Sequence, residues 1–407
     1  MAKSSLRPLT VEEALTHVLA GARPISGSHQ VDLLAAHGAV LAAPLLARHT
    51  QPPFNASAMD GYAVRTADIA VLPTVLRIIG EASAGHSFTR AVATGEAVRI
   101  FTGAPLPAGA DAVVIQENTR RDGTAVTITD GHPEADHIRP RGGDFSVGQM
   151  VLAAGTHLAA RHLTLAAAAG YAHVSVRRPP RVAILATGDE LVLPAEQPGH
   201  DQIICSNPYG VAAMVNAAGG VPVMLGIARD TAASLDEKIA EARGADILVT
   251  LGGASVGDHD LVAPALARHG MELAFWKIAM RPGKPMLFGH LGAQHVLGLP
   301  GNPVSSLITA RLFLVPLIRA MLGMPTADAE KMTAILDTAL PTNGPRAHYM
   351  RAARLPGTGS RPRVRPQANQ DSSLLTPLAA ADCLIVRPIL APALAAGAEV
   401  PVLPLDF

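Results

Sequence analysis

The sequence has few of the residues that mark several common classes of protein. Only two of its 407 residues are cysteines, and Cys205 and Cys383 stand in unrelated contexts, without the spacing of a disulfide framework or a zinc finger. Charged residues make up 16% of the chain, which is too little for a disordered protein. The 33 basic and 33 acidic side chains cancel, so no overall field attracts nucleic acid or an anionic membrane. We therefore expect a globular protein of the reducing cytosol that holds any charged ligand locally.

A long hydrophobic run is also missing. The longest uncharged stretch, between positions 201 and 229, contains two prolines and a Gly-Gly pair, which indicate a helix, a turn and a strand rather than a membrane span. Near the N-terminus, Thr10 and Glu13 have the spacing of a capping box, which predicts a short amphipathic helix ending near Gly21 rather than a secretory signal. We therefore expect a soluble protein.

The chain is long enough for two to four domains, and its composition changes along its length in four zones. Ala-rich helical segments occur in residues 1–48 and 147–178, and we expect these to pack together as one discontinuous helical domain. Residues 49–146, dense in Gly, Pro and short β-type runs, predict a β-rich insertion. Residues 179–327 alternate strand and helix signals, which is typical of a doubly wound α/β domain. Residues 328–407 return to strand-like runs and predict a second small β domain.

Individual elements can be placed within two of these zones. In the insertion, β-type runs predict strands at 74–79, 97–101 and 112–115. In the α/β zone, the same pattern predicts strands at 182–186, 221–227, 247–251 and 296–297, with helices near 232–243 and 303–321. The segment Ser-Asn-Pro at 206–208 predicts a further helix, with a cap before Pro208 at a first helical position.

Three glycine-containing loops follow three of the predicted α/β strands: Thr-Gly-Asp-Glu at 187–190, Gly-Gly-Ala-Ser-Val-Gly-Asp-His-Asp at 252–260, and Leu-Pro-Gly-Asn-Pro at 299–303. In such sheets ligands bind outside the carboxyl ends of the strands, so all three loops can line one crevice. Glycine lets a backbone approach a phosphate closely, and a helix N-terminus favours an anion. Asn302 as a cap and Ser305 in the first turn make the third loop an expected oxyanion seat. Each loop by itself is explained equally well as a tight turn.

A cationic segment at 277–284 complements these loops. The chain has only five lysines, and two of them, Lys277 and Lys284, lie with Arg281 within eight residues. Apolar side chains alternate with these charges, so we expect the bases to lie at the edge of a buried strand and to face an anionic ligand.

Acidic residues follow the same strands. Glu190, Asp258 and Asp260 lie in the glycine loops, and carboxylates beside a phosphate repel it unless a hard cation bridges them, which favours Mg²⁺. Asp258 and Asp260 alternate, so only one of them need face the site. Asp230 ends another strand, and the sequence leaves open whether it serves the site or only caps the helix that begins near Thr231.

Together these segments resemble the molybdopterin molybdenumtransferases, the MoeA family that includes the E domain of gephyrin. The resemblance covers nearly the whole chain. In the insertion it rests on Ser-Ala-Met-Asp-Gly-Tyr-Ala at 57–63, Arg-Ile-Phe-Thr-Gly-Ala-Pro-Leu-Pro at 99–107, Gly-Ala-Asp-Ala-Val-Val at 109–114 and Arg-Gly-Gly-Asp at 141–144. In the α/β zone it rests on the three glycine loops and on Pro-Gly-Lys-Pro at 282–285. Each motif is short, but their order and spacing are specific to this family.

The resemblance implies a reaction and an assembly. Members of the family take molybdopterin as its AMP adduct, bind molybdate, and use a divalent metal, here expected to be Mg²⁺, to hydrolyse the pyrophosphate bond while molybdenum is placed on the dithiolene. The products are molybdenum cofactor and AMP. The family also implies four-domain subunits that end in a small β-barrel and form a homodimer. In that dimer the insertion of one subunit faces the α/β crevice of the other, so Asp60, Thr102 and Asp144 act across the interface.

The family's functional residues fall on several positions of this chain. Glu190, Asp230 and Asp260 match its acidic site residues, with Glu190 and Asp260 as expected metal ligands. Lys277 and Arg281 match its basic residues, although relatives usually have lysine where Arg281 stands, and Ser305, Arg351 and Ser372 match its molybdate-side residues. The expected contacts to the pterin phosphates are Gly252, Gly253, Ser255, Gly257, Lys284, Pro300, Gly301 and Asn302.

Two other functions fit parts of the sequence. The gephyrin E domain uses this architecture as a non-catalytic scaffold that binds receptor peptides, but a scaffold would not require both the acidic and the basic set. A molybdopterin adenylyltransferase shares the α/β domain, but such enzymes need only that domain. Both an adenylyltransferase and molybdoenzyme apoproteins are possible partners, and no nucleic acid or membrane is expected. The sequence does not distinguish molybdate from tungstate.

Overall fold

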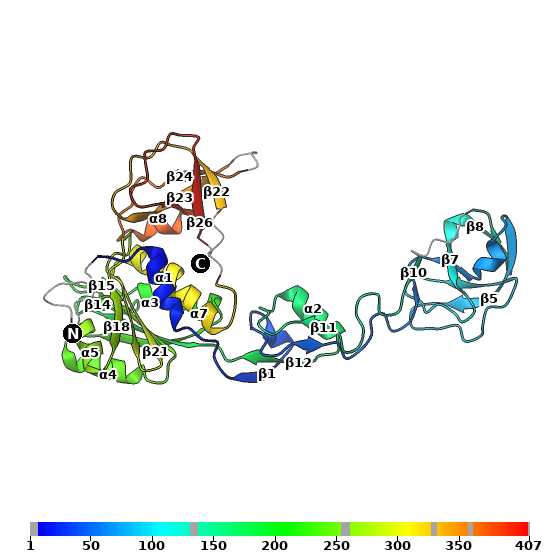
Figure 1. Cartoon of the computed structure of the whole chain (residues 1–407), viewed down its shortest axis with the longest axis horizontal. Coiled ribbons are helices and arrows are strands. Elements are labelled where there is room, and N and C mark those ends of the chain that lie inside the picture. The colour runs from blue at the N-terminus through cyan, green and yellow to red at the C-terminus, as the bar shows by residue number, and fades with distance from the viewer. Residues whose placement is uncertain (1–6, 131–136, 254–260, 327–331, 357–360, 406–407) are drawn as a thin grey trace. The chain divides into compact units, whose positions relative to one another are not determined.

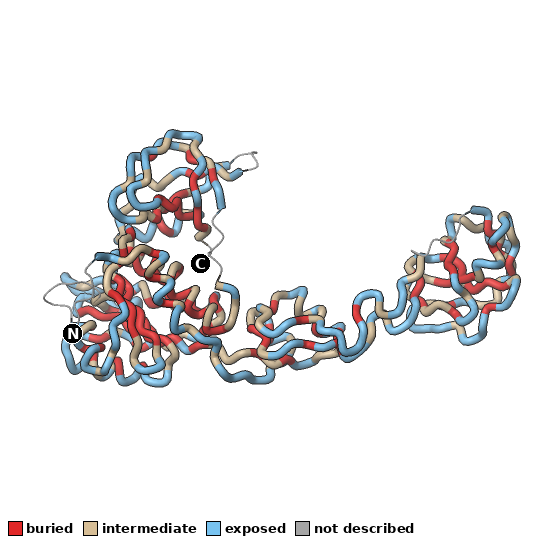
Figure 2. The backbone as a smooth tube through the Cα atoms, in the orientation of Figure 1, coloured by how far each residue is buried: buried red, intermediate tan, exposed pale blue. Residues whose placement is uncertain are grey.

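The computed structural model describes residues 7–130, 137–253, 261–326, 332–356 and 361–405. The chain divides into two compact units, one formed by Met1–His29 with Arg177–Phe407 and the other by Gln30–Val176. The first unit contains an α/β sheet with its helices and a small β-barrel, and the second contains a separate β-sheet (Figure 1). Buried residues concentrate within the sheets and under the helices of each unit (Figure 2).

A six-stranded sheet forms the centre of the first unit, with the strand order β16-β13-β17-β21-β20-β18. Its strands are β13 (Arg181–Thr187), β16 (Val221–Ala228), β17 (Ile247–Leu251), β18 (Glu272–Trp276), β20 (Leu287–Leu291) and β21 (Gln294–Leu299). Strands β13, β16, β17 and β21 run parallel, whereas β20 pairs antiparallel with both of its neighbours, β21 and β18. Every residue of the central strand β17 is buried, as expected of a strand covered on both faces. The doubly wound α/β prediction is confirmed.

Helices cover both faces of this sheet (Figure 1). They are α3 (Asn207–Ala217), α4 (Ala232–Glu241), α5 (Val262–Arg268), α6 (Pro303–Thr309) and α7 (Val315–Met321), and a π-helical turn, Ala310–Leu314, joins the last two. One face packs against α4 and α5 through a buried cluster that includes Leu235 and Leu266. The other face carries α3, α6 and α7 (Figure 1). The helices predicted near 232–243 and 303–321 are therefore both present.

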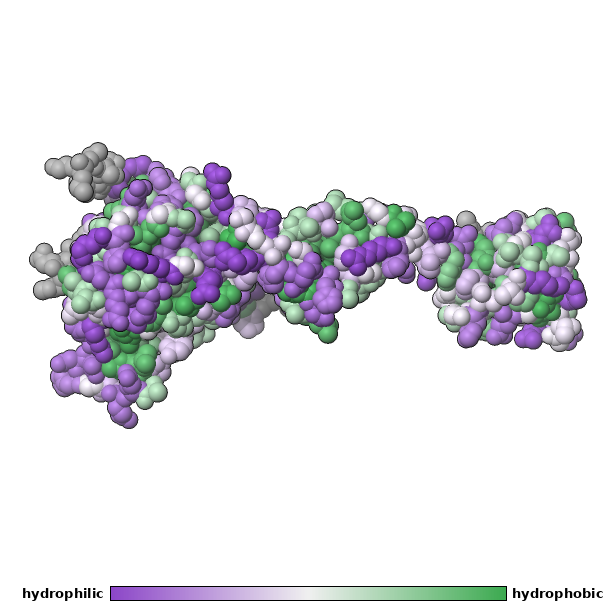
Figure 3. All heavy atoms as spheres, turned by 90° about the horizontal axis from the view of Figure 1, so that it is seen from below, coloured by the Kyte–Doolittle hydropathy of each residue, from purple (hydrophilic) through white to green (hydrophobic). Residues whose placement is uncertain are grey.

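The segment Pro303–Met321 is long and apolar enough to cross a membrane by length and composition, but 72% of its most apolar window is buried inside the structure. Helices α1 (Val11–Ala20), α3 and α8 (Leu375–Ala379) pack against it. Burial between these neighbours accounts for its apolar composition. On the face of the molecule seen in Figure 3, hydrophilic and apolar side chains are interspersed.

The N-terminal helix α1 (Val11–Ala20) has the predicted capping box, in which the Thr10 hydroxyl accepts from the Glu13 N–H at 3.2 Å and the Glu13 carboxylate accepts from the Thr10 N–H at 2.8 Å. It packs against α7 in the first unit, whereas α2 (Ala160–Ala168) lies in the second. The expectation that the two Ala-rich helices pack together was therefore wrong. Pro24 and Gly27 interrupt the helical pattern between them.

The rest of the N-terminal zone is mostly extended rather than helical. It contains β1 (Ser28–Asp32), a 3-10 turn at Leu34–Ala36 and β2 (Leu45–Leu46). These strands pair with β12 (His173–Arg177) and β11 (Met150–Leu152) respectively, forming two-stranded ribbons. A third ribbon joins β3 (Ala56–Ser57) and β10 (Ile138–Arg139).

The second unit contains a six-stranded sheet with the order β7-β4-β6-β5-β9-β8. The strands are β4 (Gly61–Val64), β5 (Thr74–Ala82), β6 (Glu96–Ile100), β7 (Ala112–Ile115), β8 (Thr119–Asp122) and β9 (Ala125–Ile128), with 3-10 turns at Thr66–Ile69 and Gln116–Asn118. Buried side chains such as Tyr62, Leu76 and Val126 form one of its cores. The strands predicted at 74–79, 97–101 and 112–115 match β5, β6 and β7.

The C-terminal segment forms a closed five-stranded barrel. Its strands are β22 (Met332–Leu336), β23 (Ala347–Leu355), β24 (Arg363–Pro366), β25 (Cys383–Arg387) and β26 (Glu399–Pro404), and helix α8 (Leu375–Ala379) lies between β24 and β25. Pairing runs β23-β24-β22-β26-β25 and returns from β25 to β23, which closes the barrel. The short strand β19 (Met280–Arg281) of the α/β segment pairs in parallel with β23. The predicted small β-barrel is confirmed, and β19 connects it directly to the α/β domain.

A bidentate ion pair fixes the start of the α/β sheet. The Arg178 guanidinium donates to both carboxylate oxygens of Asp246, at 2.9 and 2.8 Å, and the Arg181 N–H donates to the same carboxylate at 2.7 Å. Burial acts to raise the pKa of Asp246, but these hydrogen bonds lower it overall. The pair therefore stabilises the fold while Asp246 is ionised.

We expect Asp246→Asn to lower the free energy of unfolding at neutral pH by about 1 to 3 kcal/mol, because it leaves the Arg178 charge without its partner. Since the folded-state pKa is lowered, this stabilisation is complete above the unfolded-state pKa of about 4 and is lost as the pH falls through the folded-state value. Urea unfolding of wild type and variant across this pH range measures the difference. The control is Asp201→Asn, whose side chain is 94% exposed. An equal loss in the control, or a difference that grows on acidification, would contradict the assignment.

Candidate functional site

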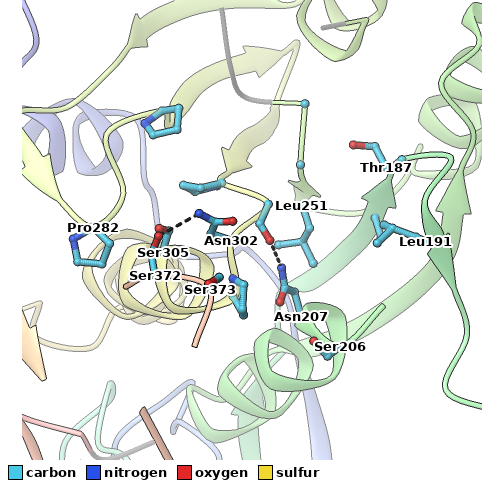
Figure 4. Close-up of a pocket in the computed structure, with 18 of the residues that line it drawn as sticks. Thr187, Leu191, Ser206, Asn207, Leu251, Pro282, Asn302, Ser305, Ser372 and Ser373 are labelled. Atoms are coloured by element: carbon cyan, nitrogen blue, oxygen red, sulfur yellow. Dashed lines mark hydrogen bonds between the residues drawn. The ribbon is translucent and has the colours of Figure 1, made fainter. Parts of the chain in front are cut away.

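A crevice of about 1010 Å³ opens at the carboxyl ends of the parallel strands (Figure 4). The strand order reverses between β13 and β17, because the chain runs from β13 outward to β16 and then returns to β17 on the other side. This switch point is where doubly wound sheets bind ligands. The described parts of all three glycine loops line the crevice, with Gly188, Gly252 and Gly301 as representatives. The expectation that these loops share one crevice is confirmed for their described residues.

Glycine at position 252 permits the closest approach between loops. Its φ of +101° is in the left-handed region, and a Cβ atom there would lie 2.9 Å from the Thr187 carbonyl oxygen. A Cβ on Gly301 would lie 3.6 Å from the Gly252 Cα. Adjacent loops therefore meet at backbone distance and form a continuous floor that a phosphate can approach.

The third loop is held from two sides. The Asn207 amide donates to the Gly301 carbonyl at 2.6 Å (Figure 4). The Ser306 hydroxyl donates to the Pro300 carbonyl at 2.8 Å. The sequence segment 206–208 predicted a cap before Pro208, but Ser206 at the N-cap makes no side-chain capping bond. The pattern Ser-Asn-Pro predicted the start of this helix, but it did not predict that the Asn207 side chain would bind the Gly301 loop.

Asn302 occupies the N-cap position of α6, but its side chain does not cap the helix. Its amide donates instead to the Ser372 hydroxyl at 2.9 Å, and the Ser372 carbonyl accepts from the Val304 N–H at 3.1 Å (Figure 4). Ser305, which is buried, lies beside Ser372 on the crevice wall. Ser305 and Ser372 thus both line the crevice, and the bonds from Asn302 and Val304 to Ser372 join the α/β domain to the loop before α8.

The barrel side of the crevice is cationic. Arg281, Lys284 and Arg346 line it, and all three are exposed. Within the described part of the chain, none of them forms an ion pair with a carboxylate. The pKa of His348, which pairs with Arg281 across β19 and β23, is lowered to about 4 by burial and by the charges of Arg281, Arg346 and two further arginines. This end of the crevice thus carries a concentrated positive charge suited to an oxyanion.

Arg351 does not line the crevice. Its side chain is only 1% exposed, and its guanidinium donates to the carbonyl oxygens of Asn369, Asp371 and Leu374, at 3.1, 2.8 and 2.9 Å. The geometry gives no support to the expected direct contact of Arg351 with molybdate, because backbone carbonyls already take its donors. It holds the loop that presents Ser372. Arg346, which directly precedes β23, lines the crevice instead, and no sequence signal singled it out.

The opposite side of the crevice is acidic. Glu190 and Asp230 line it, and neither makes an ion pair with a described residue. Thr231 caps α4 by accepting from the Ser234 N–H at 3.3 Å, so the alternative that Asp230 is only a helix cap was wrong. The Glu190 charge also acts, after burial, to raise the pKa of the neighbouring Cys205 thiol.

Mg²⁺ fits this side of the crevice by its donor set. Exposed carboxylates that are not engaged elsewhere are the ligands that Mg²⁺ takes together with phosphate oxygens, and Glu190 and Asp230 supply two of them. The other expected residues of the second loop, Ser255, Gly257, Asp258 and Asp260, lie outside the described residues. Among the described residues, no group of three or more His, Cys, Asp and Glu side chains forms a metal site by itself.

Lys277 is not part of the crevice lining. Its backbone has a φ of +81°, and its amide and carbonyl pair with Met286 and Leu9. Its ammonium lies 5.9 Å from the centre of the Trp276 ring. The cationic segment thus contributes Arg281 and Lys284 to the crevice, while Lys277 shapes the turn before them.

In the second unit, the structure brings Asp60 and Thr102 together. The Asp60 carboxylate accepts from the Thr102 N–H and from the Thr102 hydroxyl, both at 2.8 Å, and these bonds, with the Arg99 charge, lower the pKa of Asp60. Asp144 is exposed, and the next residue, Phe145, forms an isolated antiparallel β-bridge with Gln51. Asp60 is therefore a fixed, ionised carboxylate on the surface of this unit.

Three family models match the chain in order: the MoeA N-terminal region (domains I and II) at residues 9–170, the probable molybdopterin binding domain at 183–320, and the MoeA C-terminal region (domain IV) at 333–405. The molybdopterin molybdenumtransferase of Nostoc sp. is 41% identical over 304 residues, which cover 72% of this chain and 69% of that protein. Molybdopterin molybdenumtransferase 2 of Mycobacterium tuberculosis is 34% identical over 355 residues, covering 84% and 86%.

Among solved structures, the molybdopterin biosynthesis MoeA protein from Pyrococcus horikosii matches 98% of this chain and 100% of its own, with 30% identity and a TM-score of 0.82. The family models account for the insertion, the α/β domain and the barrel, and the relatives match across them. The chain therefore belongs to the MoeA family of molybdenum cofactor biosynthesis.

Proposed function

We propose that this chain is a molybdopterin molybdenumtransferase that takes adenylylated molybdopterin and molybdate, inserts molybdenum into the dithiolene and releases AMP. The observation that carries the proposal is the division of one crevice into a backbone floor, an acidic side and a cationic end. Curated relatives with this name support the transfer of molybdenum. A cytoplasmic location and acceptance of the product by molybdoenzyme apoproteins belong to the same proposal.

The floor suits the phosphates of the adenylylated pterin. Gly252 and Gly301 leave backbone exposed at close approach, and Lys284 adds a mobile positive charge at its edge. The Asn207 and Ser306 contacts keep the Gly301 loop in place without using its exposed face. Substrate binding therefore does not need to reorganise the floor.

The cationic end suits molybdate, a doubly charged tetrahedron. Arg281 and Arg346 offer guanidinium donors, and Ser305 and Ser372 offer hydroxyls from two domains. A guanidinium grips an oxyanion through two parallel hydrogen bonds, so Arg281 holds it with more directional bonds than the lysine usual in relatives.

Glu190 and Asp230 would hold Mg²⁺ against the pyrophosphate, together with Asp260, which the family resemblance assigns as a further ligand and which lies outside the described residues. When bound, Mg²⁺ supplies charge neutralisation at the phosphate oxygens as the bond to AMP breaks. The carboxylates keep it on the side of the crevice away from the arginines, so cation and oxyanion remain separate.

A homodimer completes the proposal. Asp60 is exposed, its pKa is lowered, and it lies in the unit that contributes no residue to the crevice described above. We infer that Asp60, Thr102 and Asp144 of one subunit approach the crevice of the other, where they orient the substrate or the attacking water.

Arg346→Ala should raise the molybdate concentration needed for half-maximal AMP release by roughly tenfold to a hundredfold, because it removes one charge-assisted contact. Binding of the adenylylated pterin should change little. Arg354→Ala, an exposed arginine on the same strand as Arg351, should match wild type. Arg351→Ala should instead lower thermal stability and weaken use of both substrates, since it releases the Ser372 loop. If Arg351→Ala alone raises the molybdate requirement, the assignment of Arg346 is wrong.

AMP release should require Mg²⁺, and Glu190→Gln should raise that requirement by roughly tenfold to a hundredfold. The unfolding temperature should stay near wild type, because Glu190 is exposed and makes no ion pair with a described residue. The matched control is Glu237→Gln, an exposed carboxylate on α4. Undiminished turnover after complete removal of divalent metal contradicts the role of the acidic side.

Mixing Asp60→Ala subunits with Glu190→Ala subunits should restore activity that neither variant has alone, because each heterodimer contains one crevice with both carboxylates. The measurement is AMP release after co-expression and purification through two different affinity tags. The absence of any recovery from a confirmed heterodimer shows that both residues act within one chain.

A further inference from the structure

The two carboxylates on the acidic side of the crevice come from loops that are fastened to each other. Glu190 follows β13 and Asp230 follows β16, and these neighbouring parallel strands end with the paired residues Thr187 and Ala228. The Gly188 N–H donates to the Ala228 carbonyl at 3.1 Å, so the pairing continues one residue into the loops. The spacing of the two carboxylates is therefore set at the strand ends and by the contacts that join the loops beyond them.

The Arg229 side chain makes one of these contacts. Its Nη1 donates to the Asp189 carbonyl at 3.1 Å and to the Leu191 carbonyl at 3.2 Å, and these are the residues on either side of Glu190. The Glu190 carbonyl between them accepts from the Ile203 N–H at 2.8 Å. Three consecutive carbonyl groups are thus held, which fixes the backbone that carries the Glu190 side chain.

The Asp189 side chain makes a second contact in the opposite direction. Its carboxylate accepts from the Asp230 N–H at 3.2 Å. The Arg229 backbone is also fixed, because its N–H donates to the Ser234 hydroxyl at 3.0 Å and its carbonyl accepts from the Thr231 N–H at 2.7 Å. Asp189 and Arg229 therefore form a reciprocal pair, in which each side chain binds the backbone of the other loop.

The Glu190 carboxylate is turned back over its own loop. Gly188 has a φ of +146°, and a Cβ atom there would lie 2.2 Å from Glu190 Oε2. Gly188 and Glu190 both line the crevice, whereas neither Asp189 nor Arg229 does so. The reciprocal pair thus supports the carboxylates from outside the crevice and does not itself contact a ligand there.

We infer that Asp189 and Arg229 are positioning residues for the divalent cation, because they hold the Glu190 and Asp230 carboxylates at a fixed spacing. The inference rests on the Mg²⁺ site of the proposed function. Mg²⁺ requires near-ideal coordination geometry, so carboxylates that are fixed beforehand bind it more tightly than carboxylates on loops that must first be ordered. Groups that orient metal ligands without touching the metal set its affinity in this way.

The charge of Arg229 gives the inference a sharp test, since position and charge have opposite effects. A guanidinium repels a nearby cation, so the loss of its charge alone would tighten metal binding. The loss of its two carbonyl contacts frees the Glu190 loop and weakens metal binding. We therefore expect Arg229→Met to raise the dissociation constant of Mn²⁺, used as a probe for Mg²⁺, by roughly tenfold to a hundredfold.

Electron paramagnetic resonance measures this constant when Mn²⁺ is titrated into the full-length protein without substrate, because the sharp signal of free Mn²⁺ is lost on binding. The matched control is Arg243→Met, an exposed arginine just after α4, which should bind Mn²⁺ as wild type does. Thermal unfolding checks that each variant is folded. A folded Arg229→Met protein that binds Mn²⁺ as tightly as wild type, or more tightly, overturns the inference.

Two substitutions of Asp189 test the second contact and do not depend on how well Arg229→Met folds. Asp189→Ala and Asp189→Asn remove the same charge, but the asparagine side-chain oxygen can still accept from the Asp230 N–H. Asp189→Ala should therefore weaken Mn²⁺ binding more than Asp189→Asn, and equal effects contradict a positioning role. Glu190→Gln separates this inference from the proposed function: if it binds Mn²⁺ as tightly as wild type, the metal site itself is wrong and the inference fails with it.

Discussion

Backbone contact between glycine loops at the switch point is the constraint on which the rest of the site depends. Gly252 stands against the Thr187 carbonyl with a left-handed backbone, so this position leaves no room for a side chain. A larger residue at Gly252 would both strain a left-handed backbone and separate the ends of β13 and β17. The floor of the crevice therefore follows from the strand order and from the missing Cβ atom at Gly252.

The crevice is polarised because its two sides come from different parts of the chain. Loops after β13 and β16 supply Glu190 and Asp230, whereas β19 and the loop before β23 supply Arg281 and Arg346. The short pairing of β19 with β23 brings the barrel's charges to the α/β domain. Arg351 contributes indirectly, by fixing the loop whose Ser372 meets Asn302. One crevice thus offers two separate positions, one for a phosphate ester with its cation beside the carboxylates and one for a free oxyanion beside the arginines.

Much of the architecture could be predicted from the sequence, because it depends on local patterns. The capping box at Thr10, the strand Ile247–Leu251 and the joint use of three glycine loops follow from periodicity and turn chemistry. The packing partner of α1 and the role of Arg351 could not be predicted. Helix periodicity shows which face is apolar but not which helix meets it, and spacing between arginines does not show whether carbonyl groups already take their hydrogen bonds.

The position of molybdenum tests the central claim most directly. Crystals soaked with molybdate and measured at the molybdenum absorption edge should show an anomalous peak within reach of Arg281, Arg346 and Ser372, on the barrel side of the crevice. Glu190 and Asp230 should remain outside its coordination. A peak on the Gly252–Gly301 floor, or between the two carboxylates, would contradict the division of the crevice on which this account of its chemistry is built.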